Sequence, residues 1–199
     1  MVALGLVHPD KLLKNSTGRA GDVLILTKPI GVGVYSAALK QERLDAAGYE
    51  ALIASTTQLN SVGAELARVP GVHAMTDVTG FGLLGHALEM ARGASLSAEV
   101  FADAVPLHPG VEALARAGVR TGAAVRNWSS YRDLVHLTAG FADWRCDLLC
   151  DPQTSGGLLI AAAPDAAEGI LATLVQRGFT SAAIVGRLAA GPAGIVVSD

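Results

Sequence analysis

The 199-residue sequence has few charged side chains, few aromatic side chains and only two cysteines. Charged residues make up 17% and hydrophobic residues 51%, a balance that excludes a disordered chain. A net charge of −3 gives no broad attraction to nucleic acid or to anionic lipid, so neither is expected as a partner. Cys146 and Cys150 have no second pair and no suitably spaced histidine, so we expect reduced, structural thiols and no zinc site.

Long hydrophobic runs are also missing. No apolar stretch reaches the roughly 18 residues that a membrane span needs, because Asp, Pro or Gly interrupts each candidate. The first eight residues lack the basic segment of a signal peptide, and their apolar run is too short. The sequence therefore predicts no membrane association and a cytoplasmic protein.

One stretch stands out, Thr76-Asp-Val-Thr-Gly-Phe-Gly82, and the apolar helical pattern of residues 83–91 follows it. Residues 72–78 read as a short buried strand, so the pattern is strand, glycine turn and helix. Asp77 then lies at the carboxyl end of a strand, where α/β sheets usually place ligands. The free N–H groups of a helix start favour an anion, and a carboxylate beside them favours a hard cation.

A structural interpretation of the same stretch stays open. Asp77 can cap the helix, and Gly80 and Gly82 can serve only a turn that needs positive φ. One carboxylate also cannot complete a magnesium site, since this ion takes about six oxygen ligands. Any further ligands must come from elsewhere.

The rest of the chain mixes strands and helices, which predicts one domain of α/β (α+β) class with a layered mixed sheet. Residues 118–145 have no clear period and read as a long connection. We expect strands at residues 2–8, 22–28, 97–100, 158–162, 182–185 and 194–197, and helices at residues 33–40, 49–68, 109–117 and 165–177.

Other polar residues allow two readings each. Asn60 lies inside an apolar helical pattern and is either hydrogen-bonded in the core or directed at the site. The loop of residues 151–157, Asp-Pro-Gln-Thr-Ser-Gly-Gly, could cradle an anion, although a turn that feeds the next strand explains most of it. His86 is one helical turn beyond Gly82 and stays a candidate, whereas surface or strand-end positions are expected for the other histidines, His8, His73, His108 and His136.

Several segments together resemble the C-terminal half of the selenophosphate synthetase (selenide, water dikinase) family, within the aminoimidazole ribonucleotide synthetase-like superfamily. They are Lys14-Asn-Ser16, Leu26-Thr-Lys-Pro29, residues 76–90, Arg126-Asn127 and residues 150–159. The resemblance implies a reaction of ATP, selenide and water that gives selenophosphate, AMP and phosphate with Mg²⁺. It implies Asp77 as a magnesium ligand, and we expect Thr79 and Gly80 to form a phosphate-facing turn.

The same resemblance implies an organisation in which residues 1–20 are an interdomain strand and loop and residues 21–199 are the synthetase-like C-terminal domain. The family's N-terminal catalytic domain, with its nucleophile, is absent, so we expect no catalytic residue here and an inactive chain. Its partners would be that domain and a second copy in a homodimer. The alternative is a non-catalytic, stand-alone interaction module.

Two departures from the family pattern limit what is carried over. Gly122 is followed by Ala123, Ala124 and Val125, where the family tends to show paired glycines and a hydroxyl residue, so a substrate role for this loop is not expected. Cys146 and Cys150 do not correspond to the family's catalytic thiol, which belongs to the first domain.

Overall fold

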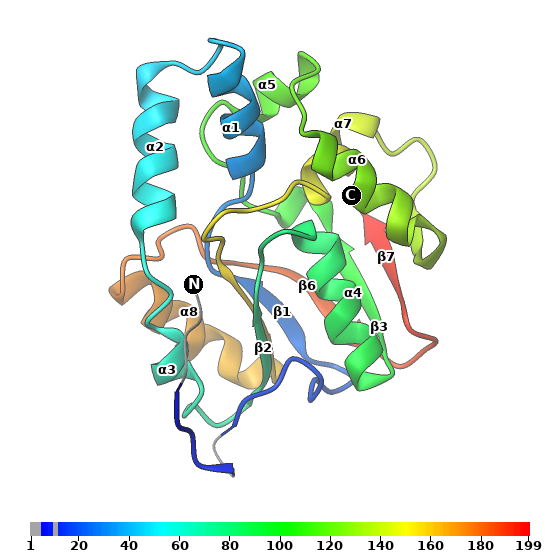
Figure 1. Ribbon diagram of the computed structural model, residues 1–199. Helices are drawn as coiled ribbons and strands as arrows, with labels where there is room; N and C mark the ends of the chain where they lie inside the picture. Colours follow the sequence, from blue (N-terminus) through cyan, green and yellow to red (C-terminus); the bar gives the residue numbers. More distant parts are fainter. Residues whose placement is uncertain (1–4, 10–11) are drawn as a thin grey trace.

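A computed structural model describes residues 5–9 and 12–199 (Figure 1). Within them the chain forms a seven-stranded sheet in the order β2-β5-β1-β6-β3-β7-β4. Pairing is mixed, because β1 is antiparallel to β5 whereas β3 is parallel to β7. The strands are β1 (Val23–Leu26), β2 (Val72–Asp77), β3 (Ser97–Phe101), β4 (Val135–Leu137), β5 (Leu158–Ala162), β6 (Ala183–Ala189) and β7 (Gly194–Ser198).

Helices cover both faces of this sheet, and a further group packs beyond the strand ends. Figure 1 shows α4 on one side of β1 and β2, and α3 with α8 on the other. No helix of the described residues is long and apolar enough to cross a membrane. The helices are α1 (Val32–Lys40), α2 (Ala46–Thr57), α3 (Gly63–Leu66), α4 (Gly82–Ala94), α5 (Val111–Arg116), α6 (Gly122–Tyr131), α7 (Asp143–Leu149) and α8 (Ala167–Gln176).

The neighbouring strands β1 and β5 are apolar on both faces, which is why their sequences are continuous hydrophobic runs. Leu24 and Leu26 of β1 point to the α4 side, and Ile25 between them points to the side of α3 and α8. A third cluster joins α1, α2 and α5. The predicted α/β (α+β) class with a layered mixed sheet is confirmed.

The prediction of a single helix over residues 49–68 is wrong. Helix α2 ends at Thr57, α3 begins at Gly63, and Gln58 has an extended backbone at φ −69° and ψ 117°. The Lys28 ammonium group accounts for the break, because it donates hydrogen bonds to the carbonyls of Ser55 and Gln58 at the end of α2.

The prediction of a long connection over residues 118–145 is also wrong, since this stretch contains α6, β4 and the first turn of α7. Helix α6 begins at an ordinary cap, with the Thr121 hydroxyl accepting a hydrogen bond from the Ala124 N–H at 3.0 Å. Of the strand expected at residues 2–8, residues 5–8 are not in a strand, and residues 2–4 lie outside the described part.

Candidate functional site

Asp77 ends the edge strand β2, opposite Leu158 of β5. Its side chain is exposed and makes no hydrogen bond or ion pair with any described residue. The N-cap position of α4 is Phe81, and no side chain caps this helix. Asp77 is therefore not a helix cap, and the structural interpretation fails at this residue. The carboxylate is free to bind a cation.

The turn between β2 and α4 offers two free donors. Within the described residues, the backbone N–H groups of Gly80 and Phe81 make no hydrogen bond, whereas Gly82 donates to the Thr79 carbonyl at 3.1 Å. A Cβ atom on Gly80 would meet nothing within 4 Å, so this side of the turn is open. An anion can approach both N–H groups, and the N-terminus of α4 lies directly behind them.

The glycine argument holds for only one of the two turn glycines. Gly82 has φ +71°, and a Cβ atom there would lie 2.6 Å from the Cys150 carbonyl carbon. Gly80 is not among the residues with positive φ. Position 82 thus requires a glycine, because of its positive φ and because of its close contact with the end of α7. Neither reason applies to position 80.

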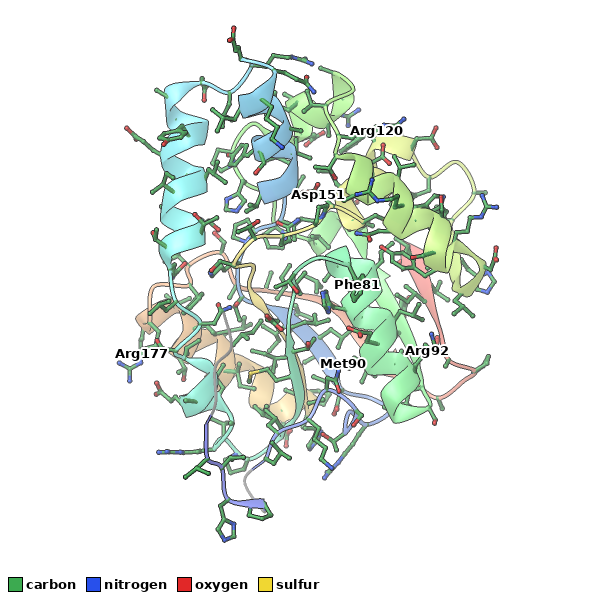
Figure 2. The ribbon with its side chains drawn as sticks, viewed as in Figure 1. Phe81, Met90, Arg92, Arg120, Asp151 and Arg177 are labelled. Carbon is green, nitrogen blue, oxygen red and sulfur yellow. The ribbon has the colours of Figure 1, made fainter. Side chains whose placement is uncertain are left out.

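Helix α6 holds this turn in place. The Asn127 side-chain amide donates to the carbonyls of Gly80 at 2.8 Å and Cys150 at 3.0 Å, and the Tyr131 hydroxyl donates to the Phe81 carbonyl at 3.0 Å. Figure 2 shows Phe81 at the start of α4. Sequence reasoning missed these supports because it did not find α6, although the cap residue Thr121 was a usable signal.

His86 is buried and joins the turn to α4. Its Nε2 atom lies 3.3 Å from the Thr79 hydroxyl oxygen, and its Nδ1 atom lies 3.0 Å from a carboxylate oxygen of Glu89. The ring also packs against Phe81, with 5.7 Å between ring centroids. The structure therefore brings His86 to the candidate site and connects it to Thr79.

The loop of residues 151–157 supports α1 through the side chains of Asp151 and Gln153, which are therefore not available to an anion. Asp151 accepts a hydrogen bond from the Val34 N–H, and the Gln153 side-chain oxygen accepts from the N–H groups of Gly31 and Val32, all at 3.1 Å. Figure 2 shows Asp151 beside the start of α1. Burial raises the pKa of the Asp151 carboxyl to about 7, although its hydrogen bonds act in the opposite direction.

The glycines of this loop allow close packing against neighbouring backbone. A Cβ atom on Gly156 would lie 2.0 Å from the Val78 carbonyl oxygen, and one on Gly157 would lie 2.5 Å from the Lys28 nitrogen. Asn60 donates to the Gly156 carbonyl at 2.7 Å, while its side-chain oxygen is buried without a partner. Asn60 is thus hydrogen-bonded to the loop, as one of its two readings proposed.

Lys28 is a buried cation without a carboxylate partner in the described structure. Its ammonium group donates to three backbone carbonyls, those of Ser55 at 3.1 Å, Gln58 at 2.7 Å and Ser155 at 2.8 Å. Burial lowers its pKa. His108, expected at the surface or a strand end, is buried instead, and burial, with a smaller effect of the Lys28 charge, lowers its pKa to about 4.

The described residues contain no group of three or more His, Cys, Asp or Glu side chains that could hold a metal ion. Asp77 therefore offers one ligand of a shell that this part of the chain does not complete, which agrees with the ligand count from the sequence. Cys146 and Cys150 are buried, and both are free thiols.

The profile of the family described as AIR synthase related protein, C-terminal domain, matches residues 19–199. The chain belongs to this family. The selenide, water dikinase of Burkholderia ambifaria (strain MC40-6) is 54% identical over 198 residues, which cover 100% of this chain and 56% of that protein. The resemblance found in the sequence is thus confirmed, and the chain spans little more than half the length of the relative.

Solved structures share the fold of this AIR synthase related domain at low identity. The hydrogenase maturation protein HypE in complex with ATP has a TM-score of 0.65 and 19% identity, over 96% of this chain and 51% of HypE. The thiamine-monophosphate kinase of Stenotrophomonas maltophilia K279a has a TM-score of 0.64 and 22% identity, over 96% of this chain and 54% of the kinase. These likenesses establish the fold.

Proposed function

We propose that this chain is the C-terminal, ATP- and magnesium-facing half of a selenide, water dikinase, which converts ATP, selenide and water to selenophosphate, AMP and phosphate. The observation that carries the proposal is the unpaired Asp77 carboxylate beside the free N–H groups of Gly80 and Phe81. The 54% identity to the Burkholderia ambifaria enzyme supports the substrate class. The ATP complex of HypE, which has a similar fold, supports ATP as the nucleotide.

In this proposal Asp77 is one ligand of Mg²⁺, and the turn at Thr79 and Gly80 faces the phosphates. Magnesium, when bound, would supply positive charge that offsets the charge of the phosphate groups. The Gly80 and Phe81 N–H groups donate to a phosphate oxygen, and the clamps from Asn127 and Tyr131 keep these donors fixed.

The chain alone is proposed to be inactive. Phosphoryl transfer depends on positioning and on charge neutralisation, and a single carboxylate with two N–H donors supplies little of either. The remaining ligands and the nucleophile are proposed to come from an N-terminal domain, as are the other walls of the nucleotide site. Residues 1–20 are proposed to connect the two domains, and a cytoplasmic location stays a prediction.

The test combines this chain with a separately produced N-terminal part of the Burkholderia ambifaria enzyme. Selenide-dependent formation of AMP from ATP is expected in the mixture and not with either part alone. Asp77→Asn is expected to lower the rate of the mixture by at least about 100-fold, because it weakens a charged metal ligand. Asp165→Asn, which changes an exposed carboxylate near the start of α8, is the matched control. Full activity of the Asp77 variant would refute its role.

The exposed apolar side chains favour a second candidate, a non-catalytic interaction module of the same fold. Leu59 is 76% exposed and Phe81 is 55% exposed, and large apolar side chains in water often mark a contact surface. The mixing experiment separates the two candidates, since a module would bind its partner without restoring activity. A homodimer through such residues is the other proposed partner, and light scattering at high concentration measures it.

A further inference from the structure

Thr79, His86 and Glu89 form a chain of hydrogen bonds at the first turns of α4. The Thr79 hydroxyl oxygen and His86 Nε2 are 3.3 Å apart, and His86 Nδ1 and Glu89 Oε2 are 3.0 Å apart. Thr79 is half-buried, His86 is buried, and the Glu89 side chain is 48% exposed. The buried imidazole thus connects a hydroxyl group at the candidate site to a carboxylate near the surface.

The chemistry of the three groups fixes the direction of both hydrogen bonds. A carboxylate only accepts, so the neutral imidazole must carry its proton on Nδ1 to donate to Glu89. Nε2 then has a lone pair and accepts the hydroxyl proton of Thr79. The opposite tautomer would place the Nδ1 lone pair against the carboxylate oxygen, which is repulsive.

A hydroxyl group has one proton, and Thr79 uses it in the hydrogen bond that it donates to His86 Nε2. The Thr79 oxygen therefore presents lone pairs to any ligand, which makes this side chain an acceptor. A phosphate oxygen needs a donor, whereas a water bound to Mg²⁺ needs an acceptor, and this ion usually keeps several of its waters. The Thr79 side chain suits the hydrated cation better than the phosphate.

We propose that Glu89 and His86 orient the Thr79 hydroxyl as an acceptor for a water bound to the cation held at Asp77. This inference rests on the proposed cation site. Only the buried Val78 separates Asp77 from Thr79, so their Cα atoms are at most about 7 Å apart, within the span of one hydrated ion. Thr79 and His86 are positioning residues in this arrangement, and the phosphate-facing part of the turn is its backbone at Gly80.

The first experiment reads the tautomer of His86 directly and needs no metal. A long-range ¹H–¹⁵N correlation spectrum of the 199-residue chain at pH 8 is expected to show the proton of His86 on Nδ1, with the signal assigned from its loss in His86→Asn. Glu89→Leu removes the acceptor and is expected to release a mixture of tautomers. A proton on Nε2 in the unsubstituted chain would overturn the proposal.

The second experiment uses Mn²⁺ as a paramagnetic probe in place of Mg²⁺. The 199-residue chain is isotope-labelled and mixed with the unlabelled N-terminal part of the Burkholderia ambifaria enzyme, because Asp77 alone supplies one ligand of the shell. Added Mn²⁺ is expected to broaden the backbone amide signals of residues 77–80 first. Thr79→Val is expected to raise the Mn²⁺ concentration for half-broadening about 10-fold, because partners of metal-bound groups typically contribute that much to affinity. Thr79→Ser keeps the hydroxyl and is expected to match the unsubstituted chain. Thr76→Val removes a hydroxyl at the position before Asp77 and is the control.

The outcomes separate this inference from the proposed function. If Asp77→Asn leaves the broadening unchanged, or if none occurs in the mixture of the unsubstituted chain with the N-terminal part, the cation site itself is wrong and this inference falls with it. If Asp77→Asn abolishes the broadening while Thr79→Val leaves it unchanged, only the role of Thr79 is refuted. Nδ1 protonation together with a weakened Thr79→Val response supports the full arrangement.

Discussion

Replacing Asp151 with Asn is expected to change how the stability of this protein depends on pH. Asp151 is fully buried, and burial raises its pKa from 3.8 to about 7. The unfolded chain releases this proton near the ordinary value, so the folded chain binds more protons between these two pH values. The contribution of this group to the free energy of unfolding is therefore complete below pH 4 and is lost as the pH rises through 7.

The size of the effect follows from the shift. Three pKa units correspond to about 4 kcal/mol at 1.36 kcal/mol per unit. The Asn side chain does not titrate, so this loss is absent from Asp151→Asn. An Asn carbonyl in the place of Oδ2 would keep the bonds from the Val34 N–H and the Gln153 amide. Its –NH2 group would then take the place of Oδ1 and turn a donor toward the Gly33 N–H and the Thr121 hydroxyl, of which only the hydroxyl can accept, at a cost of about 1–3 kcal/mol. The variant should be the less stable protein at pH 5, and the difference should vanish or reverse by pH 8.

Urea unfolding at pH 5, 6, 7 and 8, followed by circular dichroism, measures this difference. Asp133→Asn is the control, because the Asp133 side chain is 95% exposed. Its difference from the unsubstituted protein should stay constant to within about 0.5 kcal/mol, as surface substitutions usually do. A constant difference for Asp151→Asn across the same range would refute the assignment of a raised pKa to this carboxyl.

Two further predictions concern packing around the loop of residues 151–157. Lys28→Met leaves one buried and two partly buried carbonyls without their charged donor and is expected to lower the free energy of unfolding by about 3 kcal/mol in urea titrations. An unchanged midpoint would contradict a stabilising role of these three hydrogen bonds. Gly156→Ala is expected to lower the melting temperature because its Cβ atom would lie 2.0 Å from the Val78 carbonyl oxygen, whereas Gly169→Ala, in the open interior of α8, is expected to stabilise by about 0.5–1 kcal/mol; equal effects in calorimetry would contradict the packing argument.

Local patterns predicted the centre of the molecule well. The strand expected over residues 72–78 is β2, Val72–Asp77, and the helix expected from residue 83 is α4, Gly82–Ala94. Both depend on apolar periodicity and a glycine turn, which short stretches of sequence carry. The resemblance added the family and the fold. The roles of Asp77, Thr79 and Gly80 toward magnesium and phosphate stay predictions.

Prediction failed where partners distant in the chain decide local structure. An apolar stripe continues across residues 58–62, but the ammonium group of Lys28 holds the last carbonyls of α2 and the helix ends there. Helix α6 was missed although its Thr121 cap is visible in the sequence, because its ten residues include few large apolar side chains. Its importance for the site appears only through Asn127 and Tyr131, which hold the turn after β2.

The sequence by itself determined the family, the class of fold and the strand, turn and helix around Asp77, since each depends on residues close together in the chain or on a long specific motif. Only the tertiary structure decided which aspartate is available. Asp77 is open at the sheet edge, whereas Asp151, in an equally conspicuous motif, bonds to a backbone N–H 117 residues away and is sealed beneath α1. Hydrogen bonds of that separation follow from the packing of whole elements, so local sequence patterns do not specify them.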